Sequence, residues 1–156
     1  MASNYTGVNL AKADTAGKYK KVRMFFNGTG GLDTSAGGKF VALSGHGVEE
    51  AAASADVFGI VFEAVASAAS TYVDVYCGLQ DLFTAILVSS TTASANVNGQ
   101  GAYLHESSKL AVGTAGLDIV GTLQDNTGER KTAGDRVTFS LTPSEAIAGY
   151  DSGNTA

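Results

Sequence analysis

Residues 56–63 (DVFGIVFE) and residues 118–125 (DIVGTLQD) carry the same pattern, a short apolar run with Asp at its first position and Gly at its fourth. The two stretches lie 118 − 56 = 62 residues apart. An Asp at the start of a strand can bond backbone amides of the preceding turn, and a Gly within the strand permits a bulge or the close approach of another backbone. We interpret Asp56, Gly59, Asp118 and Gly121 as structural markers of an internal repeat.

The segments around each marker follow a common order. Each copy reads as a strand, a turn, a short strand, the D-x-x-G strand, a polar loop and a strand whose side chains alternate between two faces. One copy is too short to bury enough surface alone, so two copies would share a core. Strands are predicted at residues 22–26, 39–43, 57–62 and 71–77 in the first half, and at 83–88, 102–105, 119–123 and 136–141 in the second.

This pattern predicts an all-β fold, either a small β-barrel or a β-tulip-like sandwich, with two pseudo-repeated β-units as one way of building it. The repeats are placed at about residues 37–78 and 100–141, inside a β-domain spanning residues 22–142. Residues 1–21 are expected to form an extended N-terminal arm, and residues 143–156 a C-terminal tail that begins at Pro143. Residues 49–55 are Ala-rich and have helical propensity, but strand–turn–strand is the preferred interpretation there.

Composition excludes several classes of protein. The formal net charge of −5 argues against a general nucleic-acid binder, which needs a surplus of Lys and Arg. Five basic residues and one Asp give residues 1–23 a charge of +5 − 1 = +4, leaving −5 − 4 = −9 on the rest. The lone Cys77 excludes an intramolecular disulfide, and no apolar stretch approaches the ~20 residues that span a bilayer. We expect no signal peptide and folding in a reducing cytoplasm.

The sequence offers little catalytic chemistry. His46 and His105 both lie beside turns, and Ser44 near His46 lacks the G-x-S-x-G elbow of a hydrolase. A phosphate loop around residues 31–40 fails at the first required Gly and at the hydroxyl residue after Lys39. No clustering of Cys, His or Asp has metal-ligand spacing. We therefore expect a protein that is not an enzyme, with no catalytic residue, no metal and no cofactor.

Residues 37–51, 56–64 and 71–78 together resemble the small decoration, or cement, proteins of tailed-phage capsids. The resemblance covers this region and, more weakly, residues 100–141. It implies a β-barrel or β-tulip-like domain, homo-oligomers with trimers favoured and dimers possible at capsid symmetry axes, and a location on the virion surface. It further implies that an extended arm adds a strand or clasp to the major capsid protein.

On this hypothesis the protein binds the exterior of a phage capsid and stabilises it by bridging capsomers, with no nucleic-acid or membrane partner. Deleting residues 1–20 is then expected to abolish head binding and to leave the melting of the β-domain nearly unchanged. The basic arm mixes cations with aromatic and aliphatic groups, and a solvated approach to the first strand is its plainer interpretation. The capsid-contact candidates are Tyr5, Val8, Leu10, Lys18, Lys20, Lys21 and Arg23.

Three alternatives remain open at this stage. A tail- or fibre-associated β-module of a virion would form rings or filaments as a pure protein. A carbohydrate-binding module would stack exposed aromatic side chains on sugars, and the absence of Trp weighs against it although six Tyr are present. A hydrolase would need a cleft with perturbed titratable groups, for which the sequence shows no starting point.

Overall fold

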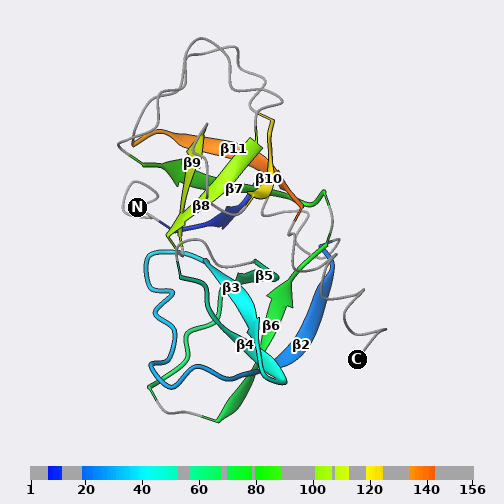
Figure 1. Cartoon of the computed structure of the whole chain (residues 1–156), viewed down its shortest axis with the longest axis vertical. Coiled ribbons are helices and arrows are strands. Elements are labelled where there is room, and N and C mark those ends of the chain that lie inside the picture. The colour runs from blue at the N-terminus through cyan, green and yellow to red at the C-terminus, as the bar shows by residue number, and fades with distance from the viewer. Residues whose placement is uncertain are drawn as a thin grey trace.

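The computed structural model describes residues 7–11, 19–52, 57–67, 70–78, 80–88, 101–106, 108–112, 119–124 and 134–142. All the regular structure in these ranges is β-strand, and the strands form two closed five-stranded barrels. The N-terminal barrel is the lower half of Figure 1 and the C-terminal barrel is the upper half. The predicted all-β class, with two related β-units, is confirmed.

The N-terminal barrel has the strand order β2-β4-β3-β5-β6, closed by pairing between β6 and β2. Its neighbours are antiparallel except for β2 and β4, which meet in parallel at Phe26 and Val48. Its strands are β2 (Lys21–Phe26), β3 (Lys39–Ser44), β4 (Gly47–Glu50), β5 (Gly59–Val61) and β6 (Thr71–Tyr76).

The C-terminal barrel repeats this topology strand for strand, in the order β7-β9-β8-β10-β11. Its single parallel pair again joins the first and third strands, β7 and β9. The repeat therefore begins at β2 and at β7, one strand earlier in each half than the predicted spans of 37–78 and 100–141. Its strands are β7 (Leu82–Leu87), β8 (Gly101–Glu106), β9 (Lys109–Val112), β10 (Ile119–Leu123) and β11 (Arg136–Leu141).

The marker glycines occupy equivalent positions in the two barrels. Gly59 in β5 lies opposite Val41 of β3, and Gly121 in β10 lies opposite Ala102 of β8. A Cβ atom added to Gly59 would lie 2.6 Å from the carbonyl oxygen of Tyr76, and one added to Gly121 would lie 2.1 Å from that of Ser140. Each glycine thus lets its strand approach the last strand of its barrel. Asp56 and Asp118 lie outside the described residues.

All eight predicted strands are present, with ends shifted by two residues at most. Three others, β1 (Asn9–Leu10), β4 and β9, were not predicted, and the last two occupy the same place in each barrel. β4 includes Glu49 and Glu50, so the start of the Ala-rich segment is strand and not helix. β3 and β4 are joined by Gly45 and His46, and the φ of +58° at Gly45 is the positive value that a two-residue hairpin requires of its first residue.

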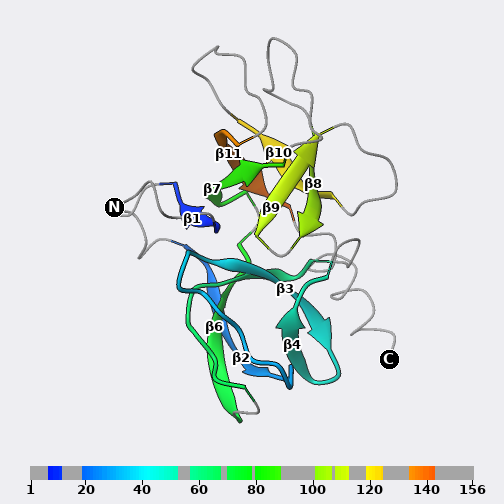
Figure 2. The same ribbon diagram turned by 90° about the vertical axis from the view of Figure 1, so that its left-hand side faces the viewer.

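Two apolar clusters hold the molecule together. The first fills the N-terminal barrel and includes Phe26, Val41, Val61 and Val75. The second fills the C-terminal barrel and continues onto the outer face of the N-terminal one, where Phe40 lies 6.0 Å from Phe139, measured between ring centroids. Figures 1 and 2 show the two barrels stacked one above the other. The two repeats therefore share a core, as their size predicted.

The N-terminal segment around β1 (Asn9–Leu10) is part of this core. β1 adds to β7, with Asn9 opposite Thr84 and Leu10 opposite Phe83. Val8 is fully buried and exchanges backbone hydrogen bonds with Gly38 of 2.9 and 2.7 Å. Figure 2 shows β1 lying between the two barrels. This part of the predicted arm therefore packs within its own chain.

Arg136 of β11 also binds the N-terminal segment that precedes β1. Its guanidinium donates to the hydroxyl of Thr84 at 2.9 Å and to the carbonyl oxygen of Gly7 at 3.0 Å. Burial lowers the pKa of Arg136, because the low-dielectric surroundings disfavour its charge. The two hydrogen bonds offset part of that cost and connect β11, β7 and the N-terminal segment.

Candidate interaction surface

The outer face of the β2–β6 ribbon carries a row of paired side chains. In this antiparallel pair Lys21 lies opposite Tyr76, Arg23 opposite Asp74, and Phe25 opposite Tyr72. Side chains directly opposite one another on one face are close enough to interact. All three pairs do so, by a cation–π contact, an ion pair and an aromatic contact respectively. We name these six residues, with Glu63 and His46 beside them, the β2–β6 face.

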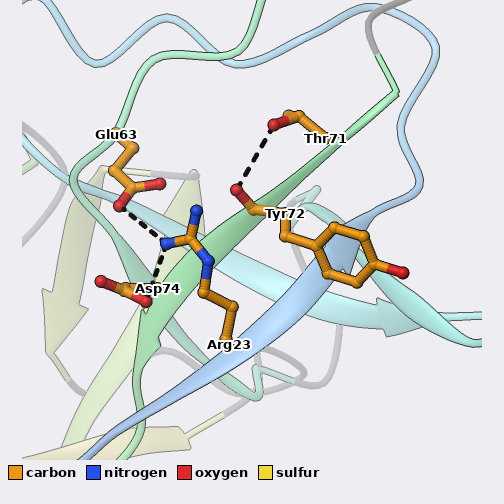
Figure 3. A network of polar contacts seen from close by, with 5 residues as sticks. All are labelled: Arg23, Glu63, Thr71, Tyr72 and Asp74. Carbon is orange, nitrogen blue, oxygen red and sulfur yellow. Dashed lines mark hydrogen bonds and ion pairs between the residues drawn. The ribbon is translucent and has the colours of Figure 1, made fainter.

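Arg23 is the centre of the β2–β6 face. Its Nη1 atom donates to Asp74 at 3.0 Å and to Glu63 at 3.5 Å, so one nitrogen bridges two carboxylates (Figure 3). The hydrogen bond to Asp74, followed by the charges of Asp74 and Glu63, raises the pKa of Arg23. The side chain is 58% exposed. An ion pair this exposed contributes little to folding stability. The guanidinium of Arg23 is therefore accessible to a partner and is not required to hold the fold together.

Aromatic groups gather at the end of the face away from the C-terminal barrel. The ring of Phe25 stacks on His46 at 5.4 Å with an interplanar angle of 19°, and meets Tyr72 edge-on at 5.6 Å and 71°. Tyr72 is 57% exposed, the most exposed large hydrophobic residue in the described ranges. Its ring projects away from the ribbon in Figure 3. Exposed Tyr and Arg side chains are the types that most often anchor protein interfaces.

The opposite end of the face is tied to the shared core. Lys21 places its Nζ atom 5.5 Å from the ring centroid of Tyr76. Tyr76 in turn contacts Tyr19 and Phe62, at 6.1 and 5.0 Å between ring centroids, and Phe62 stacks on Phe83 at 6.4 Å. The ribbon is therefore held at one end by packing between the barrels and presents its exposed groups from a rigid support.

The seven predicted contact residues separate into three groups. Lys20, Lys21 and Arg23 lie at the surface, the last two on the β2–β6 face. Val8 is buried and Leu10 is half-buried against the core, so Val8 offers no surface to a partner. The residues that lie outside the described ranges are Tyr5 and Lys18.

Sequence reasoning missed the partners of Arg23 and the aromatic cluster. Asp74 and Tyr72 belong to the predicted alternating strand at residues 71–77, and no local feature indicates that this strand pairs with residues 21–26. The alternation in both strands was the available signal. The pairing comes from barrel closure, which brings together residues as far apart in sequence as Arg23 and Asp74, with |i−j| = 51, and a local pattern does not encode it.

The structure shows the surroundings of His46, Ser44 and Cys77. His46 stacks on Phe25, and the carbonyl oxygen of Ser44 accepts a hydrogen bond of 2.8 Å from the Asn27 side chain. Cys77 is buried, and desolvation raises the pKa of its thiol. Within the described residues no three His, Cys, Asp or Glu side chains gather as metal ligands would. In the same ranges no helix is long and apolar enough to cross a membrane.

No protein-family model matches this chain, and no curated protein matches it significantly.

Proposed function

We propose that the protein is a non-enzymatic structural component of a virion, which binds the exterior of a tailed-phage capsid and stabilises it by bridging capsomers. The resemblance of residues 37–78 to capsid decoration proteins supports this proposal. The major capsid protein is its partner, and the protein is itself a homo-oligomer. Its place of synthesis is the host cytoplasm, and its final location is the capsid surface.

The observation that carries the proposal is the exposed β2–β6 face on a rigid support. Two barrels with one shared core form a body that resists deformation, which a clamp between capsomers requires. Arg23 and Tyr72 are exposed on that body and supply the charged and aromatic anchors of an interface. Many copies on one shell act together, so modest affinity per copy is sufficient.

The test is to incubate the purified protein with expanded phage heads and to image the heads. We expect regular density at fixed positions on the shell. The double variant Arg23→Ala, Tyr72→Ala should bind at least about tenfold more weakly, since each anchor of this type typically contributes more than 1 kcal/mol. Ile119→Ala is the matched control, because Ile119 is 41% exposed but lies on the other barrel. Heads without added density would contradict the proposal.

Carbohydrate binding is the second candidate, because Tyr72 is exposed beside Phe25 and His46 as in a sugar-stacking platform. A glycan array separates the two functions. Binding to glycans that Tyr72→Ala abolishes, together with no binding to heads, would replace the first proposal with the second.

A further inference from the structure

The two barrels differ at one place on their first strands. Leu87 of β7 and Phe26 of β2 are equivalent, because each is the residue where its strand meets the parallel neighbour. In the register of these parallel pairs, the earlier residues of each first strand lie beyond the start of the neighbouring strand, which begins at Gly47 in β4 and at Lys109 in β9. On β7 this extra length is covered by β1. On β2, no strand from the described ranges covers the same length.

The side chains of the two first strands also differ in burial over this length. Counting back from the equivalent pair Phe26 and Leu87, Met24 corresponds to Ala85 and Val22 corresponds to Phe83. Ala85 and Phe83 are fully buried, whereas Met24 and Val22 are only half-buried at the margin of their core. Phe26 and Leu87 themselves are both buried. The first strands therefore differ in burial at the positions on either side of Thr84, which β1 and the shared core cover in the C-terminal barrel.

The backbone of Arg23 faces the uncovered side. Asn27 donates its N–H to the carbonyl oxygen of Val48 at 2.7 Å, so the odd-numbered residues of β2 direct their main-chain groups toward β4 and the even-numbered ones toward β6. Arg23 follows this alternation and directs its N–H and C=O to the edge beyond the hairpin tip. Its equivalent in the C-terminal barrel, Thr84, directs the same groups to Asn9 of β1.

The side chain of Arg23 has donors to spare at this edge. Both of its carboxylate partners, Asp74 and Glu63, are reached through Nη1. Its Nη2 and Nε atoms make no hydrogen bond to any residue in the described ranges, and Figure 3 marks contacts to the two carboxylates from a single nitrogen. Asp74 lies on one neighbouring strand of β2, so a carboxylate on a strand added at the other side would meet the unused donors.

We propose that the edge of β2 from Lys21 to Met24 is a binding site for an extended segment of a partner protein, which adds antiparallel to β2 as β1 adds to β7. The segment carries an acidic residue opposite Arg23 and apolar residues on either side, opposite Val22 and Met24. The main-chain hydrogen bonds supply affinity and the alternating side chains supply specificity. This inference goes beyond the capsid role, because it names a binding mode and a strand chemistry that do not depend on which protein supplies the strand.

The probe is the synthetic peptide TGVDLAS, which follows residues 6–12 of the chain (TGVNLAK) with Asp in place of Asn9 at the centre and Ser in place of Lys12 at the end. Amide NMR spectra of the full-length protein are recorded during titration with this peptide. We expect saturable shifts confined to Lys21–Phe25 and their β6 neighbours. A peptide with Lys at the centre should bind more weakly. N-methylation of the central Asp should weaken binding about threefold to tenfold, as for one lost hydrogen bond, whereas N-methylation of the following Leu should not.

Two variants of Arg23 separate main-chain from side-chain recognition. Arg23→Thr places at this position the residue that β7 has, and should retain binding while losing the preference for Asp over Lys. Arg23→Pro removes the edge-facing N–H, which makes no bond to β6, and should abolish binding with the remaining spectrum unchanged. If Arg23→Pro fails to fold, the N-methylated peptides alone decide the matter.

Three results would overturn the proposal. The first is the absence of shifts at Lys21–Phe25 at saturating peptide. The second is slow hydrogen exchange of the Arg23 amide in the peptide-free full chain, which would mean that this chain fills the edge itself. The third is concentration-dependent self-association that protects the Arg23 amide, which would assign the edge to a second copy. None of these results depends on head binding, so the capsid proposal stands or falls separately.

Discussion

At the residue scale, Gly59 and Gly121 show most directly what the repeated sequence pattern encodes. We expect Gly59→Ala and Gly121→Ala each to lower the free energy of unfolding by about 1–3 kcal/mol, because the added Cβ meets a backbone carbonyl that a side-chain rotation cannot move aside. Gly30→Ala is the control, since a Cβ there meets nothing within 4 Å. Urea unfolding measures all three. Equal stability of Gly59→Ala and Gly30→Ala would contradict the close approach.

Cys77 provides a prediction on pH. Desolvation is the main cause that raises its pKa, with a further contribution from the charge of Asp81, so the folded state favours the protonated thiol. The stability that this preference contributes is fully present below the unfolded thiol pKa of about 8.5 and is lost as pH rises through the higher folded value. The stability of the natural protein relative to Cys77→Ala should therefore decline above about pH 8.5.

Thiol labelling checks the same group independently. Cys77 should react with a disulfide reagent at pH 8 at least about tenfold more slowly in the folded protein than in urea, because both burial and the raised pKa reduce accessible thiolate. Similar rates in the two states would show that the thiol is accessible.

Single residues also mark the limit of what sequence reasoning found at the β2–β6 face. The cluster of basic residues predicted that Lys21 and Arg23 would be exposed, and both are. It could not predict that Asp74 and Glu63 partly neutralise Arg23, because those contacts depend on which strands pair when the barrel closes. The sequence also does not predict the surface contacts of Phe25 with His46 and Tyr72. Phe25 lies in the apolar end of its strand and therefore resembles a core residue.

At the element scale, the strands that were missed have a common cause. β4 (GVEE) and β9 (KLAV) are four residues long, so neither contains enough positions to establish an alternating pattern. Each strand exists because a tight turn folds it back on the longer strand before it. β1 has only two residues and is a strand because β7 offers it an edge. Strand propensity and the alternating pattern therefore predicted the longer strands. The three short strands form because a neighbouring strand pairs with them.

The N-terminal segment revises one expectation. Deleting residues 1–11 should lower the free energy of unfolding by at least about 2–3 kcal/mol, because it removes the buried Val8 and uncovers Phe83 and Ala85. The structure thus replaces the expectation that the arm can be removed with little effect on melting. Deleting residues 1–6 is the matched control and should cost far less. Thermal unfolding of both truncated proteins makes the comparison, and equal melting would show that β1 is dispensable.

At the scale of the whole molecule, the continuous core makes the two barrels interdependent. Phe40, Ala42 and Ile60 belong to strands of the N-terminal barrel but are buried with the residues of the C-terminal one. A sequence repeat predicts two similar units without saying which outer face of one packs on the other. Here the outer face of β3 packs on the C-terminal barrel through Phe40 and Ala42, whereas Val41 between them points into the N-terminal barrel. Both faces of this strand are buried, a feature that its run of apolar residues already contained.

The continuous core should also make the two barrels unfold cooperatively. Phe40→Ala removes a fully buried ring at the contact with Phe139 and should lower the free energy of unfolding by about 3–5 kcal/mol. Because the lost packing belongs to the shared core, we expect amide signals from both barrels to report the same lowered urea midpoint. Phe25→Ala on the exposed β2–β6 face is the control; it loses only its surface aromatic contacts and should cost about 0.5–1.5 kcal/mol for each. If only the N-terminal barrel shifted its midpoint, the barrels would be independent units, and the rigid support on which the β2–β6 face depends would be lost.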